Sequence, residues 1–171
     1  MASRVIQLFL AVGLLAPLAA GASSGGGSRT WVTVERVVDG DTLVVRGGGR
    51  VRLVQIDAPE SGEECYSGAS TLELARLAPP GSRVALEADP ALDRVDRYGR
   101  WLRYVHSGGR NVNVELVRRG AAAPWFYEGE RGRYAARLIV ATAGARSARR
   151  GMWAACRVSW TPYGPVTTRP R

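Results

Sequence analysis

Short apolar runs rich in β-branched residues alternate with polar or glycine-rich breaks from residue 31 onward. Asp39-Gly40-Asp41 forms one break, and Gly47-Gly48-Gly49 forms a second that is typical of a hairpin turn. Short runs of this kind, bounded by turn signals, predict strands. The predicted strands are Trp31–Val38, Thr42–Arg46, Arg50–Ile56, Arg83–Glu87 and Trp101–His106.

Three later segments place apolar residues at helical spacing. Ser67–Leu77 ends before a proline pair, Val112–Arg119 is followed by Gly120 as a C-terminal cap, and Gly132–Arg150 is rich in Ala and Arg. Five short strands with helices inserted late predict an α+β fold. We expect a small, partly open, five-stranded antiparallel barrel of the OB type with three packed helices.

The two ends of the chain have compositions of their own. One positive charge in Met1–Arg4, an apolar run over Val5–Ala20 and small residues up to Ala22 predict a secretory signal peptide over residues 1–22. An uncleaved N-terminal anchor is the alternative, and in both cases the working domain is extracellular. We expect no membrane span after signal cleavage.

The remaining chain divides into three parts by composition. A Ser/Gly-rich start predicts a flexible linker over residues 23–30, and the patterned region predicts one domain over residues 31–156. Residues 157–171 contain three prolines and no apolar period, which predicts an extended tail. Trp160 and Tyr163 are candidates for pinning part of that tail to the surface.

The chain is strongly basic, with 24 basic residues, 15 acidic residues and a net charge of +9. Such a charge on a compact exported protein suggests a polyanionic partner such as nucleic acid, although it also favours solubility and surface adhesion. The basic residues are all Arg, for which biased codon composition is the simpler explanation. Cys65 and Cys156 lie far apart without a CxxC pattern, so export predicts a structural disulfide between them.

The side chains available for catalysis are limited. A single histidine, His106, excludes mechanisms that need two histidines and excludes a His-rich zinc site. No Gly-x-Ser-x-Gly elbow occurs. Carboxylates, arginines and a hard metal ion therefore remain as the candidate catalytic groups.

The carboxylates gather at two breaks between strands. Asp39 and Asp41 follow the first predicted strand, while Asp57 and Glu60 follow the third. In a meander these breaks can meet at one surface, where ligands that are all oxygen atoms suit Ca²⁺ or Mg²⁺. Taken singly, each acidic group could equally be a simple turn.

Two arginine positions strengthen the case for a phosphate site. Arg52 lies within the third predicted strand, where a charged side chain must be exposed or paired. Asp96-Arg97-Tyr98-Gly99-Arg100 is a compact charged run before the fifth strand. The planar guanidinium of Arg matches two phosphate oxygens at once.

Three ordered blocks resemble the signature blocks of the staphylococcal nuclease (thermonuclease) family. They are Val37–Thr42, Val51–Glu60 and Asp96–Arg100. Val112–Gly120 resembles the helix that follows in that family, and Gly151-Met152-Trp153 resembles its closing segment. The likeness covers about Trp31 to Cys156, and three blocks in order are far more specific than any one alone.

The resemblance implies an OB barrel with three helices, active on single- and double-stranded DNA and RNA with Ca²⁺ as cofactor. It implies little sequence specificity, 3′-phosphate products and a monomer. By position, the resemblance implies that Asp41, Asp57 and the backbone carbonyl of Ala58 bind the metal ion, with Asp39 in contact with these ligands rather than with the metal. It implies that Glu60 activates the attacking water and that Arg52 and Arg100 bind the phosphate. The residues implied to surround the substrate are Arg97, Tyr98, Trp125 and Tyr127.

The sequence also departs from the family. The segment after Glu60 is short and contains Cys65, where the best-known member has a longer Lys-rich loop, and Trp125 replaces a tyrosine. The Cys65–Cys156 pair has no counterpart in that member. A non-catalytic OB module that binds nucleic acid, and a cationic surface-adhesion protein, stay open as alternatives.

Overall fold

The computed structural model of the protein describes residues 29–171. The predicted signal peptide and residues 23–28 of the predicted linker lie outside the described residues. No helix within residues 29–171 is long and apolar enough to cross a membrane.

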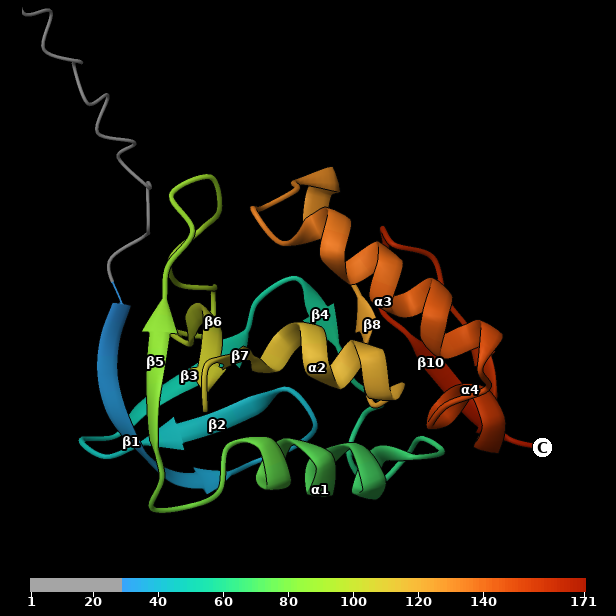
Figure 1. Cartoon of the computed structure of the whole chain (residues 1–171), viewed down its shortest axis with the longest axis horizontal. Coiled ribbons are helices and arrows are strands. Elements are labelled where there is room, and N and C mark those ends of the chain that lie inside the picture. The colour runs from blue at the N-terminus through green and yellow to red at the C-terminus, as the bar shows by residue number, and fades with distance from the viewer. Residues whose placement is uncertain (1–28) are drawn as a thin grey trace, which may run out of the picture.

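Five strands form a closed barrel on one side of the molecule (Figure 1). They are β1 (Arg29–Val37), β2 (Thr42–Val45), β3 (Gly49–Leu53), β5 (Arg83–Glu87) and β6 (Trp101–Ser107). Neighbours in the order β3-β2-β1-β5-β6 are antiparallel, and β3 closes the barrel by pairing parallel with β6. Val34, Leu43, Val51, Leu53 and Val105 fill the interior and have no exposed surface.

The helices cover the barrel and continue away from it. Figure 1 shows α2 (Val112–Arg119) between the barrel strands and α3 (Ala135–Ser147), with α1 (Ser67–Leu77) beside it. The Asn111 side chain caps the N-terminus of α2 by accepting from Val114 N, and Gly120 ends the helix in the left-handed conformation. A short helix, α4 (Met152–Ala155), and a 3-10 turn, η1 (Tyr127–Gly129), complete the helical elements.

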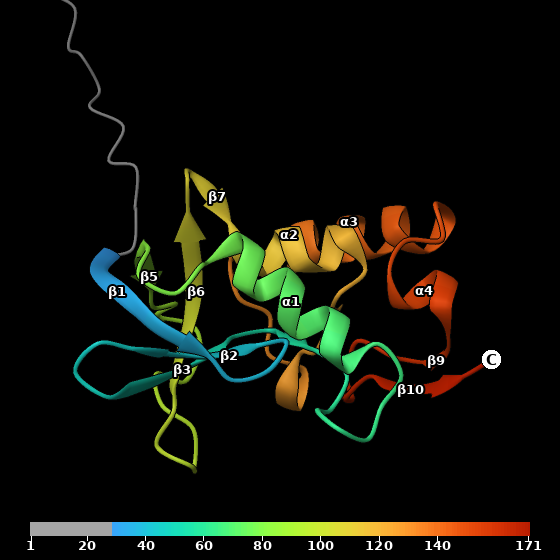
Figure 2. The ribbon, with the colours of Figure 1, turned by 90° about the horizontal axis from the view of Figure 1, so that it is seen from below.

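Three short strands and a hairpin lie outside the barrel sheet or at its edge. β7 (Arg110–Asn111) extends the sheet beyond β6, and β4 (Ile56–Asp57) pairs with β8 (Ala123–Pro124). The hairpin consists of β9 (Cys156–Ser159) and β10 (Thr167–Pro170), which are antiparallel (Figure 2).

The structure confirms the α+β barrel with three helices and corrects some of its details. The barrel is closed rather than partly open, and it is mixed rather than antiparallel throughout, because the closing β3–β6 pair is parallel. The third strand ends at Leu53, since Gln55 adopts a φ of 63° that breaks the alternation predicted through Ile56. Arg29 and Thr30, assigned to the linker, belong to β1 and pair with β5.

The predicted extended tail after Cys156 is wrong, because most of it folds as the β9–β10 hairpin. Val166 and Cys156 are buried there with Met152 in a second apolar cluster, and Trp160 packs against them. Trp160 Nε1 donates to the Pro124 carbonyl, whereas Tyr163 is 61% exposed. The predicted disulfide between Cys65 and Cys156 is present and joins the hairpin to the segment before α1. β9 and β10 are each too short to show an apolar period in the sequence, which is why the sequence did not predict the hairpin.

Replacing Gly120 with Ala is expected to lower the free energy of unfolding by about 2 kcal/mol or more. Gly120 has a φ of 73°, and an added Cβ would overlap the carbonyl of Arg150. Gly144→Ala is the matched control, because Gly144 lies inside α3 with no atom near the new methyl group. It should raise stability by about 0.5–1 kcal/mol. Urea denaturation measures both, and equal effects of the two substitutions would contradict the proposed cap.

Candidate functional site

Three charged side chains meet where β2, β3 and β4 converge. The guanidinium of Arg52 is ion-paired through Nε to Asp41 Oδ1 at 2.9 Å and through Nη2 to Asp57 Oδ1 at 2.7 Å. Its Nη1 donates to the carbonyls of Leu53 and Ile56, at 2.8 and 2.7 Å. All three charged residues are at most 8% exposed. The turn at Gln55 makes this possible by folding β4 back toward the end of β3.

The outer oxygens of the two carboxylates accept backbone hydrogen bonds. Asp41 Oδ2 accepts from Ala58 N at 2.9 Å, and Asp57 Oδ2 accepts from Val166 N at 2.9 Å. Asp39 acts on the site through the backbone, because its Oδ1 accepts from Asp41 N at 3.0 Å. The two carboxylates are therefore held by Arg52, by the N–H of Ala58 and by the N–H of Val166, from three segments of the chain.

Burial dominates the electrostatics of both carboxylates. It raises the pKa of Asp41 to about 7 and the pKa of Asp57 to about 6, although the charge of Arg52 opposes both shifts. Asp39 and Asp57 raise the pKa of Asp41 further, and the nearby Glu60 and Glu64 do the same for Asp57. One guanidinium thus leaves negative charge uncompensated, which a cation would neutralise.

These donors fit a hard divalent cation only in part. Within residues 29–171, no group of three His, Cys, Asp or Glu side chains is arranged to hold a metal ion by itself. Two fixed carboxylates with excess negative charge are nevertheless suitable oxygen ligands, provided that water and a backbone carbonyl complete the shell.

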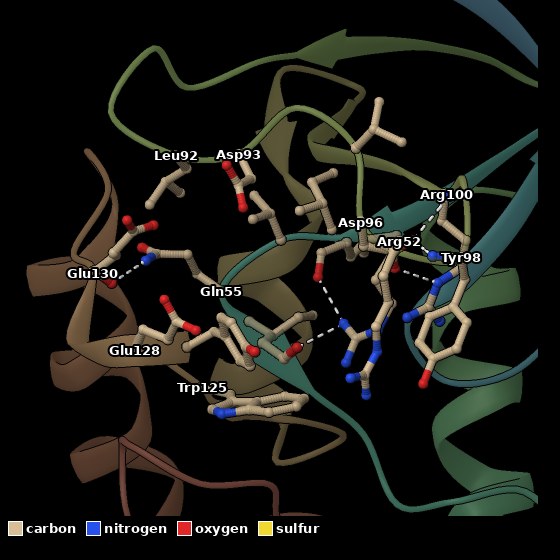
Figure 3. A pocket seen from close by; sticks show the side chains of 17 residues that line it. Arg52, Gln55, Leu92, Asp93, Asp96, Tyr98, Arg100, Trp125, Glu128 and Glu130 are labelled. Carbon is tan, nitrogen blue, oxygen red and sulfur yellow. Dashed lines mark hydrogen bonds and ion pairs between the residues drawn. The ribbon is translucent and has the colours of Figure 1, made fainter.

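A cavity of about 380 Å³ opens beside the buried cluster. Figure 3 shows its two ends, with Arg52, Arg100 and Tyr98 toward one and Gln55, Glu128 and Glu130 toward the other. Arg97, Trp125 and Tyr127 also line it. The cavity therefore combines cationic and aromatic surfaces within reach of one bound group.

Asp96 organises the cationic end of the cavity. Its Oδ1 accepts from the backbone N–H groups of Tyr98 and Arg100, and its Oδ2 accepts from Arg100 Nε at 2.7 Å. The guanidinium carbons of Arg97 and Arg100 lie 5.0 and 5.4 Å from the centre of the Tyr98 ring. At the other wall, the rings of Trp125 and Tyr127 meet edge to face with centroids 5.9 Å apart.

The structure brings most of the predicted site residues together. Asp41, Arg52 and Asp57 are in direct contact, and Arg97, Tyr98, Arg100, Trp125 and Tyr127 share the cavity with Arg52. Glu60 is exposed on the loop after Asp57 and does not line the cavity, although it lies close enough to affect the pKa of Asp57. Ala58 contributes an N–H to Asp41, so its predicted role through the carbonyl stays a prediction.

Sequence reasoning missed Gln55, which joins the cavity to the segment before α3. Its Oε1 accepts from Tyr104 Oη at 3.1 Å and from Gly132 N at 2.9 Å, while its Nε2 donates to the Glu130 carbonyl at 2.7 Å. The available signal was a lone amide between Val54 and Ile56 in an otherwise apolar run. His106 is 7% exposed and pairs with Glu87 away from this cavity.

Comparisons with known proteins find relatives of this chain among nucleases. The sequence model described as "Staphylococcal nuclease homologue" matches residues 50–155. The chain is 36% identical over 102 residues to a thermonuclease of Staphylococcus intermedius, covering 55% of this chain and 59% of that protein. It is 40% identical over 126 residues to an uncharacterized endonuclease of Escherichia coli O157:H7, covering 70% and 74% respectively. The chain thus spans less than two thirds of the thermonuclease's length.

The metal-free protein should become less stable, relative to its Asp41→Asn variant, as the pH rises from about 4 to about 7. Asp41 has a folded-state pKa raised from 3.8 to about 7, so its stabilising contribution is complete below about pH 4 and is lost above about pH 7. We expect the difference in Tm between the two proteins in EDTA to change by roughly 4 °C or more over this range. A pH-independent difference, measured by calorimetry, would contradict the raised pKa.

Proposed function

The chain belongs to the staphylococcal nuclease family, and from this membership we propose that it is a secreted nuclease that hydrolyses phosphodiester bonds in both DNA and RNA. The observation that carries the proposal is the buried Asp41–Arg52–Asp57 cluster beside a cavity that also contains Arg100. The matched relatives are named as a thermonuclease and as endonucleases, which supports the same reaction class.

Arg52 and Arg100 hold the phosphate that is attacked. Each guanidinium Nη group has two N–H donors, and Arg52 Nη2 uses one of them for Asp57. Arg100 is held by its Nε, and within residues 29–171 neither of its Nη groups makes a hydrogen bond. Arg100 can therefore offer its Nη donors to phosphate oxygens, while Arg52 offers one N–H from a fixed position. Such prearranged donors stabilise the negative charge that develops during in-line attack.

Asp41, Asp57 and the carbonyl of Ala58 are the groups that would hold a divalent cation, for which we propose Ca²⁺. When bound, this ion supplies positive charge to the phosphoryl oxygens. Glu60 orients the attacking water and accepts its proton, a role that suits an exposed carboxylate beside the cluster. The raised pKa values of Asp41 and Asp57 mean that cation binding displaces protons, so binding weakens as the pH falls below 6–7.

The proposed substrate contacts are made to the phosphate backbone of the nucleic acid and to the faces of its bases. Tyr98, Trp125 and Tyr127 can stack a base of either sugar type, and the arginines contact phosphate alone. We therefore propose little sequence specificity, and family membership supports 3′-phosphate products from a monomeric, extracellular enzyme.

Purified protein should degrade plasmid DNA and RNA in Ca²⁺ and lose this activity in EDTA. Parallel digestions with Mg²⁺ and Mn²⁺ establish which ion supports cleavage. The products should accept phosphate from polynucleotide kinase at their 5′ ends without prior phosphatase treatment, because cleavage leaves the phosphate on the 3′ side. Tight nucleic-acid binding that is unaffected by EDTA, together with intact substrate, would instead identify a non-catalytic binding module.

Glu60→Gln and Arg100→Ala should each lower kcat by roughly two to three orders of magnitude. Glu60 is exposed and Arg100 is half-buried, so both variants should retain the fold and have a nearly unchanged Tm. Glu63→Gln is the matched control, since Glu63 is an exposed carboxylate on the same loop. Glu63→Gln activity equal to that of the Glu60 variant would argue against a specific role for Glu60.

A further inference from the structure

The β9–β10 hairpin contacts the segments that carry the proposed site residues. Val166 N donates to Asp57 Oδ2 at 2.9 Å, in a region where both residues are buried. The carbonyl of Pro162 accepts from Phe126 N at 2.7 Å, and Trp160 Nε1 donates to the Pro124 carbonyl at 2.7 Å. These last two contacts fix the backbone on both sides of Trp125. The hairpin thus reaches both a proposed metal ligand and the proposed aromatic wall.

Glu64 connects the same hairpin to the loop of Glu60. Its Oε2 accepts from Glu60 N at 2.9 Å, and its Oε1 accepts from Thr168 N at 3.0 Å. Thr168 Oγ1 also donates to the carbonyl of Cys65 at 2.6 Å, next to the disulfide that joins Cys65 to Cys156. One carboxylate, one hydroxyl and one covalent bond therefore tie this loop to the hairpin.

The loop depends on such ties because it has little structure of its own. Residues 58–66 contain no helix or strand, and Glu60 itself is exposed. At its start the loop is held through Ala58 N, which donates to Asp41. Glu60 itself is held by the hydrogen bond from its N–H to Glu64 and by the turn hydrogen bonds that its carbonyl accepts from Glu63 N and Glu64 N. A catalytic group that moves by about 1 Å can lose about 100-fold in rate.

We propose that the β9–β10 hairpin is a positioning element of the active site and that Glu64 couples it to Glu60. This inference rests on the proposed nuclease function. Glu64 acts through Glu60, since each of its carboxylate oxygens accepts a backbone N–H and neither is assigned to substrate. The hairpin supports the metal ligand Asp57 in the same way, through the N–H of Val166.

The test measures kcat and KM on a defined oligonucleotide in Ca²⁺ for wild type, Glu64→Ala, Glu64→Gln and the control Glu63→Ala. Glu64→Ala should lower kcat by about 10–100-fold and leave KM within about twofold, because phosphate binding by the arginines is untouched. Glu64→Gln keeps one acceptor and should be intermediate. Glu63→Ala should match wild type. All assays are run well below the Tm of each variant, with the disulfide confirmed by thiol titration.

A double-mutant cycle separates positioning from general destabilisation. If Glu64 acts through Glu60, Glu64→Ala should cost little further kcat in a Glu60→Gln background, where the positioned group is already disabled. An equal fold-loss in both backgrounds would overturn the proposal, as would wild-type kcat for Glu64→Ala. Wild-type protein that fails to cleave in any divalent ion refutes the nuclease function itself, so the two failures are distinguishable.

Discussion

A guanidinium buried between two carboxylates is the interaction on which the rest of the site depends. Three charges removed from water are costly unless each is paired and hydrogen-bonded. Arg52 meets this requirement with contacts to Asp41, to Asp57 and to two carbonyls of its own chain. Removing Arg52 would leave two carboxylates buried without a counter-charge. The cluster therefore fixes the ends of β2, β3 and β4 relative to one another.

The local backbone is shaped to serve this cluster. Gln55 holds a φ of 63°, a conformation that residues other than glycine adopt at a cost. In that position the side-chain amide of Gln55 forms hydrogen bonds with Tyr104, Gly132 and Glu130, so the surrounding structure stabilises the turn. Asn113 gives further support from α2, because it is fully buried and bonds the backbone of Val54 and Val105. Buried amides thus hold the scaffold that carries the charges.

The sequence predicted the parts of the structure that local patterns determine. Helix α1 occurs at the predicted bounds, because its apolar residues have helical spacing from its first turn and a proline pair follows its last residues. Convergence of Asp41 and Asp57 also followed from strand order. Strand order and local patterns did not predict three other features, namely the parallel β3–β6 closure, the turn at Gln55 and the docking of the hairpin. Each depends on partners far away in the chain, such as Val166 for Asp57, and no local period encodes such pairs. The disulfide was predictable only because two cysteines allow a single intramolecular pair.

The distance along the chain between Asp57 and the residue that bonds it has a consequence during synthesis. Val166 lies 109 residues downstream of Asp57. At the roughly 5–20 residues per second of a ribosome, that interval takes on the order of ten seconds. Throughout it the nascent chain already contains Asp41, Arg52 and Asp57 but lacks the hairpin that supports them. A chain released after Tyr127 but before Val166 would contain every residue assigned to the reaction and still lack this support.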